Sequence, residues 1–595
     1  MTVLQALDRY YDRMAARGEA EAPGYSREKI SFAIVLSPAG EPIDRMDRRQ
    51  PSGRKLVPRL EEVPAAVKRT VAILPNLLWD KSAYVLGRTA GEGRRTAEEH
   101  AAFKALHLEL LAGTQDVGLL ALRRFLEAWT PDRFDASPFV PEMLDANLIF
   151  RLEGALDFIH ERAAAREVVA AQAGGEGPRA FCLVTGREAP VRRLHPSIKG
   201  VEGAQSSGAA LVSFNLDAFT SYGKEQGANA PTSEAAAFRY GAALNRMLDR
   251  GSPNRLPRPI GDASVIFWAD ASEAAAEAAE DLFAQFFNPP VVETASGNLE
   301  RDAQEAPRLG DALRHVAAAR PLRDLDPRLS EGVRFHVLGL SPNAARLSIR
   351  FWLTDSFEAF ARRLAQHYAD LSIEPLPWRA NPPAVNWLLV KTTALQEKFD
   401  NIPPLLAGEV TRAILAGTPY PRTLLAAALI RLRAGDDPST GWHAAAIRAV
   451  LARLLDKEKS PVSLDRENRH PAYQLGRMFA MAEIAQRMAL GKVNATIRDR
   501  YFGAASATPA SVFPLLLRGM QHHLSKLRKD GKGGFIEREM DQIATQLPPD
   551  LPRALRLEEQ GRFVIGYYHQ RKARVAGKPV DEIADEETPE EGDAQ

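Results

Sequence analysis

The first residues of the chain carry apolar side chains at the spacing of an α-helix. Leu7, Tyr11 and Met14 lie three or four positions apart, so one face of a helix would bury them. Thr2 is a candidate N-cap, and Gly18 is placed to end the helix. The pattern therefore predicts a helix at the N-terminus.

Short apolar runs bounded by Gly and Pro predict strands in the first two-thirds of the chain, with segments of helical spacing between them. The predicted strands are residues 30–36, 181–184, 209–214 and 264–268, together with a hairpin of 333–338 and 345–352. The predicted helices are 96–171, 232–249, 271–287 and 355–371, whereas 58–75 fits a loop with a short helix. This mixture predicts an α+β fold with short sheets.

The last third of the chain, from about residue 384 onward, shows apolar positions at helical spacing only, which predicts an all-α helical bundle. Gly- and Pro-rich stretches at 174–178 and 375–383 mark boundaries. We therefore expect an N-terminal α+β domain at 1–173, a central α+β domain with polar Gly-rich loops at 179–374, a basic helical bundle at 384–578 and a disordered acidic tail at 579–595.

The composition is that of an ordinary globular protein, with 45% hydrophobic and 26% charged residues among 595. Cys182 is the only cysteine, which excludes a disulfide framework and a zinc site built from several cysteines. The N-terminus lacks the apolar core of a signal peptide, and no apolar run approaches the ~18 residues of a membrane span. We therefore expect a cytoplasmic protein that makes no contact with a membrane.

The net charge of +1 averages three unlike regions. Residues 1–400 carry 49 Lys and Arg against 52 Asp and Glu, residues 401–578 carry 28 against 16, and residues 579–595 carry none against 8. A basic region followed by an acidic tail is typical of proteins that meet nucleic acid. The alternative is that the basic side chains are dispersed over solvated helix faces.

Common catalytic signatures are missing from the sequence. No Gly-Lys pair has the upstream Gly of a phosphate-binding Walker loop, and neither a G-x-S-x-G elbow nor an H-E-x-x-H zinc motif is present. His522 and His523 are adjacent, so on a helix they diverge by about 100° and cannot easily chelate one ion. No carboxylate cluster supports the rival interpretation as a metal-dependent nuclease. The sequence therefore indicates recognition without catalysis, with no metal and no cofactor.

Residues 200–209 are the first of two polar segments that offer groups for gripping phosphates and base edges. Their three glycines allow close approach of the backbone to a ligand and can form an anion-binding nest. Gln205, Ser206 and Ser207 are the candidate DNA contacts, and Gln205 could also act as a wedge in a duplex. The alternative is a structural loop that closes on the sheet.

Residues 221–229 are the second polar segment. Tyr222 can stack on a base, and Lys224 can contact phosphate or guanine. The amides of Gln226 and Asn229 can pair with adenine. The alternative is an ordinary surface loop.

Residues 74–86 combine the polar side chains of Asn76 and Lys81 with the aromatic rings of Trp79 and Tyr84. This mixture suits contact with nucleic acid. The alternative is that the aromatic rings anchor the segment to the core.

Clustered basic residues are candidate contacts to phosphate. Arg192, Arg193, His195 and Lys199 form a basic turn. In the C-terminal helices, the candidates to line a groove for single-stranded nucleic acid are Arg498, Arg500, Arg518, Lys526, Arg528 and Lys529. Taken singly, each is more often a solvated charge.

Six longer stretches follow one another in a consistent order along the chain. They are LQALDRYYDR, LWDKSAYVLG, LHPSIKGVEGAQSSGAALVSFN, AFTSYGKEQGANAPTSEAAAFRYGAALN, NATIRDRYFGAASATPASVFPLLLRG and QGRFVIGYYHQR. In these stretches the chain resembles the large subunit of the type I-C CRISPR surveillance complex, Cascade, which forms the Dvulg-subtype CRISPR-associated protein family. The resemblance covers about residues 1–575.

The resemblance implies a non-catalytic subunit that recognises the protospacer-adjacent motif (PAM) in target double-stranded DNA. Such a subunit helps to open the duplex into an R-loop, holds the displaced strand and helps to recruit a helicase–nuclease. Its other partners would be the guide-RNA complex, with backbone subunits, a guide-RNA-processing subunit and small subunits that the C-terminal bundle resembles. In this division of labour the guide RNA reads the sequence, and the protein reads the short motif and the DNA shape.

The resulting hypothesis assigns PAM and duplex contacts to the polar candidates and contacts with the displaced strand to the basic ones. The PAM and duplex set is Asn76, Lys81, Gln205, Ser206, Ser207, Lys224, Gln226 and Asn229. The phosphate and displaced-strand set is Arg192, Arg193, Lys199 and the six basic residues of the C-terminal helices. The alternative is a structural scaffold of the complex that does not read the motif directly.

Overall fold

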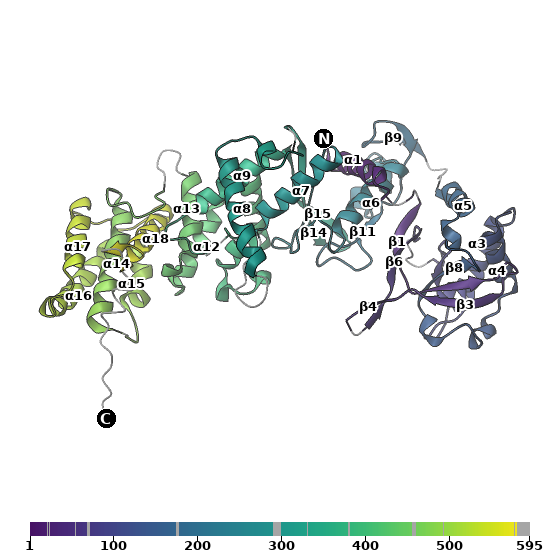
Figure 1. Cartoon of the computed structure of the whole chain (residues 1–595), viewed down its shortest axis with the longest axis horizontal. Helices are drawn as coiled ribbons and strands as arrows, with labels where there is room; N and C mark the ends of the chain where they lie inside the picture. Colours follow the sequence, from purple (N-terminus) through teal and green to yellow (C-terminus); the bar gives the residue numbers. More distant parts are fainter. Residues whose placement is uncertain are drawn as a thin grey trace, which may run out of the picture. The chain divides into compact units, whose positions relative to one another are not determined.

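The computed structural model describes residues 1–595 except 21, 23, 54, 68, 70–71, 174–177, 290–298, 330, 379–380, 455–459, 492, 576–577 and 580–595. The chain divides into two compact units. Unit 1 comprises Met1–Ile198 and Ala210–Arg246, and unit 2 comprises Lys199–Ala209 and Met247–Gln595. Both contain helices and short sheets, which confirms the α+β class (Figure 1). The four-part division stays a prediction, and its 174–177 linker and its acidic tail beyond Pro579 lie outside the described residues.

Helix α1 of unit 1 spans Val3–Ala16 and confirms the predicted N-terminal helix. Thr2 Oγ1 accepts a hydrogen bond from the Gln5 N–H at 3.3 Å, and Gln5 Oε1 accepts one from the Thr2 N–H at 3.0 Å. These two bonds satisfy two of the donors that every helix leaves unpaired at its start. The capping box therefore explains why the helix begins where the sequence predicts.

A four-stranded sheet in the order β3-β2-β8-β7 lies in the first part of unit 1. β2 (Phe32–Leu36) runs antiparallel to β3 (Pro42–Asp47) and parallel to β8 (Asn147–Leu152). The prediction that helix dominates 96–171 agrees with three helices there but is wrong at β8, because a short buried apolar run carries no local mark that separates strand from helix. The fourth strand of the sheet is β7 (Asp80–Lys81), and the helices in this part of unit 1 are α2 (Ser82–Val85), α3 (Thr96–Leu110), α4 (Val117–Ala128) and α5 (Ala163–Ala173).

An antiparallel pair of β1 (Tyr25–Ile30) and β6 (Arg59–Pro64) also belongs to unit 1. The prediction of a loop with a short helix is therefore wrong for β6. Both strands are rich in charged residues of low strand propensity, and pairing with each other decides their conformation. β4 (Gln50–Ser52) and β5 (Lys55–Val57) form a further small hairpin.

The second part of unit 1 contains a two-stranded sheet of β9 (Arg179–Phe181) and β10 (Glu188–Pro190). α6 (Glu234–Leu248) confirms the helix predicted for 232–249 and packs on α1, where Arg239 donates from Nη2 to Asp12 Oδ1 at 2.6 Å. The prediction of a strand at 181–184 is wrong beyond Phe181, where β9 ends and a turn follows, and the strand predicted at 209–214 is reduced to two residues. The remaining strands in this stretch are β11 (Ser197–Ile198) and β12 (Ala209–Ala210).

The core of unit 2 begins with an antiparallel sheet in which β14 lies between β13 and β15. The hairpin and the helices predicted around it are confirmed. The rings of Phe267, Phe283 and Phe335 pack between the sheet and its helices, with centroids 4.8 to 4.9 Å from that of Phe283. The elements are β13 (Ser264–Asp270), α7 (Glu273–Phe287), α8 (Leu299–Ala317), β14 (Arg334–Asn343), β15 (Arg346–Ser356) and α9 (Phe357–Leu371).

The rest of unit 2 is helical, as the sequence predicts. The helices are α10 (Val385–Val390), α11 (Pro404–Ala416), α12 (Arg422–Arg433), α13 (Trp442–Leu454), α14 (Pro471–Leu490), α15 (Ile497–Ala507), α16 (Pro509–Lys529), α17 (Gly534–Gln546) and α18 (Leu557–Arg571). The described residues between 384 and 573 contain no strand, and a short pair of β16 (Arg574–Val575) and β17 (Lys578–Pro579) follows. Among the described helices, none is long and apolar enough to cross a membrane.

Candidate nucleic-acid interface

Residues 221–229 form a closed loop on unit 1, which we call the Tyr222 loop. Asn229 closes it with three hydrogen bonds: Oδ1 accepts from the Ser221 N–H at 3.1 Å, and Nδ2 donates to the carbonyls of Lys224 at 3.0 Å and Gln226 at 3.1 Å. The Lys224 N–H donates to the Ser221 carbonyl at 3.0 Å. The amide of Asn229 is thus engaged within the loop and fixes its shape.

Tyr222 lies at the tip of this loop and is 99% exposed. Its φ of +52° and the +69° of Gly223 are both left-handed, and with the bond between Lys224 and Ser221 they make a type I′ turn. A bulky residue rarely adopts this conformation, which costs on the order of 1–3 kcal/mol. The turn therefore holds the Tyr222 ring in solvent instead of packing it against the chain.

The basic turn at residues 192–195 is joined to the Tyr222 loop through Gly227. The Gly227 N–H donates to the Arg193 carbonyl at 3.0 Å. A Cβ at Gly227 would lie 2.0 Å from the Arg192 carbonyl oxygen, so only glycine fits this close approach. Arg192 and Arg193 are exposed, and Arg192 Nε donates to the Leu194 carbonyl at 2.9 Å. The loop and the turn therefore share one surface, which we call the loop–turn surface.

His195 of the basic turn is buried and does not belong to this exposed surface. Its Nδ1 lies 2.7 Å from the hydroxyl of Tyr240 on α6. Burial, with a smaller contribution from the charge of Arg192, lowers the pKa of His195 to about 4. His195 is therefore neutral at pH 7 and anchors the turn to α6, instead of adding a positive charge for phosphate.

The loop–turn surface presents an aromatic ring, an ammonium group and two guanidinium groups to solvent: Tyr222, Lys224, Arg192 and Arg193 are all exposed. Cations attract the phosphate backbone, and an aromatic face stacks on any base. Gln226, half-buried with a left-handed φ of +47°, adds an amide at its edge. This combination is suited to binding a nucleic acid.

The glycine-rich loop at residues 200–208 belongs to unit 2. Gln205, Ser206 and Ser207 are exposed, and the Gly208 N–H donates to the Gln205 carbonyl at 2.9 Å, so the two serines lie at the centre of a turn. The loop is attached to the start of β13, where the Glu202 N–H donates to Ser264 Oγ at 2.9 Å. Lys199, at the start of this segment, is half-buried.

The segment 74–86 is largely part of the core of unit 1. Asn76 is only 4% exposed, and its Oδ1 accepts a hydrogen bond from the Val67 N–H at 2.9 Å. Trp79 and Tyr84 are buried, and Trp79 Nε1 donates to the Pro64 carbonyl at 2.7 Å. Of the two polar candidates, Asn76 is buried and Lys81, just before α2, is exposed. The aromatic rings anchor the segment, and the burial of Asn76 keeps it from a ligand.

The six basic candidates on α15 and α16 fall into two classes. Arg498 pairs with Asp437 at 2.8 Å, Arg528 pairs with Glu537 at 2.5 Å, and Lys526 Nζ donates to the Ala489 carbonyl at 2.6 Å. Three others are exposed and have no side-chain partner within the described part of the chain: Arg500, Arg518 and Lys529. These three side chains therefore retain their full capacity to bind phosphate.

Two exposed apolar residues were not anticipated from the sequence, which predicted a strand at 181–184 without assigning its faces. Phe181 is 71% exposed and Leu183 is 64% exposed, while Cys182 between them is buried. β9 ends at Phe181 and Leu183 lies in the turn that follows, so no strand pattern in the sequence marks this exposed pair. The described residues contain no group of three or more His, Cys, Asp or Glu side chains that could hold a metal ion.

The model of the family described as CRISPR-associated protein (Cas_Csd1) matches residues 7–575 of the chain. The match includes both units and every candidate residue described above. A search of curated proteins finds no match.

Proposed function

We propose, from the premise that this chain belongs to the Cas_Csd1 family of CRISPR-associated proteins, that it is the non-catalytic large subunit of a type I-C guide-RNA surveillance complex. In this role it recognises the PAM in target double-stranded DNA, promotes duplex opening and R-loop formation, and stabilises the displaced strand. A separate helicase–nuclease, which the subunit helps to recruit, cuts the DNA. The chain itself needs no cofactor.

The observation that carries the proposal is the Tyr222 loop. A strained, fully exposed tyrosine stands beside Lys224 and two exposed arginines, on a loop whose shape Asn229 fixes. Cations position the protein on the DNA backbone, and the ring can stack on a base that becomes unpaired as the duplex opens. The same surface would then contact the DNA and help to open the duplex.

The proposed assignments follow the exposure of each candidate. Lys81, Gln205, Ser206, Ser207, Lys224 and Gln226 contact the duplex and its motif, joined by Tyr222. Asn76 and Asn229 act as positioning residues, because hydrogen bonds within the chain engage their amides. For the displaced strand we assign Arg192, Arg193, Lys199, Arg500, Arg518 and Lys529 as direct contacts, and Arg498, Lys526 and Arg528 as supporting charges.

A structural scaffold is the second candidate function, and the exposure of Phe181 and Leu183 favours it. Exposed apolar side chains of this size often mark a protein–protein contact. A scaffold would use this face to hold a neighbouring subunit and would leave motif reading to other chains. The two functions differ in whether substitutions in the Tyr222 loop change the affinity for DNA.

Lys224→Ala and Tyr222→Ala test the proposal, with Lys29→Ala as the matched control. Lys29 is an exposed lysine of β1, so its loss removes the same charge elsewhere on unit 1. We expect Lys224→Ala to weaken binding of target duplex by the assembled complex and to reduce the slope of log K against log salt by about 1. Tyr222→Ala should weaken binding by ~1–3 kcal/mol without changing that slope. Affinities and slopes equal to those of Lys29→Ala would contradict the proposal and favour the scaffold.

A further inference from the structure

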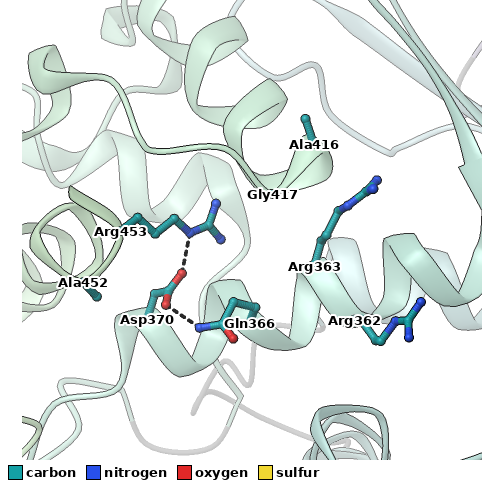
Figure 2. Close-up of a pocket in the computed structure, with 8 residues that line it drawn as sticks. All are labelled: Arg362, Arg363, Gln366, Asp370, Ala416, Gly417, Ala452 and Arg453. Carbon is teal, nitrogen blue, oxygen red and sulfur yellow. Dashed lines mark hydrogen bonds and ion pairs between the residues drawn. The ribbon is translucent and has the colours of Figure 1, made fainter. Parts of the chain in front are cut away.

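Three arginines line one cavity of about 460 Å³ in unit 2 (Figure 2). Arg362, Arg363, Gln366 and Asp370 come from α9, where spacings of three or four residues place them along the same side of the helix. Arg453 reaches in from α13, and Gly417 at the end of α11 also lines the cavity. We call this site the arginine cavity.

The lining of the arginine cavity has an excess of positive charge. Asp370 is its one carboxylate among the described lining residues, and both oxygens are engaged: Oδ2 accepts from Arg453 Nε at 2.6 Å, and Oδ1 accepts from Gln366 Nε2 at 2.7 Å. Outside the lining, Asp355 accepts from Arg363 Nη2 at 2.6 Å. Arg453 pairs with Asp370 and Arg363 pairs with Asp355, so these two carboxylates offset two of the three positive charges and the charge of Arg362 is left without a paired carboxylate.

Arg453 is held rigidly and retains one unused donor. Its side chain is 9% exposed, Nη1 donates to the carbonyls of Ala413 and Thr418 at 2.8 Å, and the Tyr420 ring lies 4.2 Å from its guanidinium carbon. Nη2 is buried and has no hydrogen-bond partner within the described part of the chain. A buried donor left unpaired is unfavourable, so an acceptor is the group that this site lacks.

Arg362 supplies a second donor at the outer side of the cavity. It is exposed, and its side chain has neither an ion pair nor a hydrogen bond with any residue that the structure describes. It precedes Gln366 by one helical turn, so both lie on the same side of α9. Guanidinium groups match the oxygens of phosphate in charge and in geometry.

We propose that the arginine cavity binds the phosphate backbone of a single-stranded nucleic acid, with Arg453 as the inner donor and Arg362 as a donor to a neighbouring phosphate at the outer side. A cavity of about 460 Å³ has room for a backbone segment of one strand, whereas a duplex is too wide to enter. The choice of a nucleic acid over a free anion rests on the proposed function. DNA and RNA offer the same phosphodiester, and the experiment separates them.

The test uses the full-length chain with Arg362→Ala, Arg362→Lys and a matched control, Arg323→Ala. Arg323 is also exposed in unit 2 and lies outside the cavity, so its removal changes the charge equally. Dissociation constants are measured by fluorescence anisotropy for ten-residue oligo-dT and oligo-rU, and thermal shifts are measured with inorganic phosphate against chloride at equal ionic strength. We expect Arg362→Ala to raise the dissociation constant of one or both strands roughly tenfold. Arg362→Lys should have a smaller effect, and Arg323→Ala should have almost none.

Two results would overturn this inference. Equal weakening by Arg362→Ala and Arg323→Ala would mean that only net charge matters. A phosphate-induced thermal shift that disappears in Arg362→Ala, with unchanged affinity for both strands, would identify a site for free anions. Measuring Lys224→Ala on duplex DNA in parallel separates the proposals, because that variant tests the loop–turn surface and leaves the arginine cavity intact.

Discussion

At the scale of single residues, Asn76 and Asn229 are polar candidates whose amides are both engaged within the chain. Asn76 accepts a hydrogen bond from Val67, and Asn229 makes three bonds across the Tyr222 loop. Neighbouring Tyr222 is strained and exposed. Residue type alone identified a polar segment, but the hydrogen bonds decide which side chains shape it and which can contact a partner.

His107 shows how a buried hydrogen-bond pattern fixes a charge state. Its Nδ1 lies 2.7 Å from the Phe103 carbonyl, so it donates there, and its Nε2 accepts from the Leu78 N–H at 2.8 Å. Only the neutral ring can donate at one nitrogen and accept at the other. Burial lowers the pKa of His107 to about 4. The native state therefore binds fewer protons than the unfolded state between about pH 4 and 6.5.

The first prediction concerns acid stability. Because the folded pKa of His107 is lowered, its contribution to the free energy of unfolding is complete above about pH 6.5 and is lost as the pH falls toward 4. At pH 5 the loss from this residue is roughly 2 kcal/mol. His107→Gln also carries a donor and an acceptor but does not titrate, so its stability should fall less between pH 7.5 and pH 5. Denaturant unfolding of both proteins at the two pH values checks this, and an equal loss in both would contradict it.

At the scale of secondary-structure elements, α14 and α18 approach each other closely at two glycines. A Cβ at Gly476 would lie 2.0 Å from the Phe563 carbonyl oxygen, and a Cβ at Gly566 would lie 2.1 Å from the Tyr473 carbonyl oxygen. Backbone atoms cannot move aside as a flexible side chain can. Glycine on both helices is therefore a condition of this packing.

The second prediction follows from that contact. Gly566→Ala should destabilise the protein by roughly 1–3 kcal/mol or more, because its methyl group forces the helices apart. Gly519→Ala is the matched control, since Gly519 lies inside α16 with no atom within 4 Å of its Cβ position. That substitution should stabilise the protein by ~0.4–1 kcal/mol through helix propensity. Thermal unfolding of both variants measures the difference, and a shift of the same sign in both would refute the packing argument.

The elements that sequence could predict are those set by local pattern. The capping box of α1, the hairpin of β14 and β15, and the periodic helices of the last third all carry their signals within a few residues. β8 and the pair of β1 and β6 carry none, because each becomes a strand only by pairing with a distant segment.

The candidate site also has parts that the sequence could predict and parts that it could not. Glycine and polar content marked both loops, and the exposure of Gln205 and Lys224 agrees with that signal. The burial of Asn76 and His195 depends on packing with distant residues, which no local pattern records. The arginine cavity joins α9 to α11 and α13, so its members are adjacent only in the fold.

At the scale of the whole molecule, candidate contacts occur in both units. Unit 1 carries the loop–turn surface, and unit 2 carries the glycine-rich loop, the exposed basic residues of α16 and the arginine cavity. Residues 401–578, which carry 28 basic against 16 acidic residues, all belong to unit 2. Many separate phosphate contacts predict binding that weakens steeply as salt rises.

The most direct test of the central claim is DNA binding by the guide-RNA complex, reconstituted with and without this chain. Target duplexes carry every variant of the flanking trinucleotide, and affinities are measured at fixed salt. We predict that the chain restores tight binding to a narrow set of flanking sequences, and that Tyr222→Ala and Lys224→Ala reduce it. Binding that is equally selective without the chain would contradict motif recognition and leave the scaffold as its function.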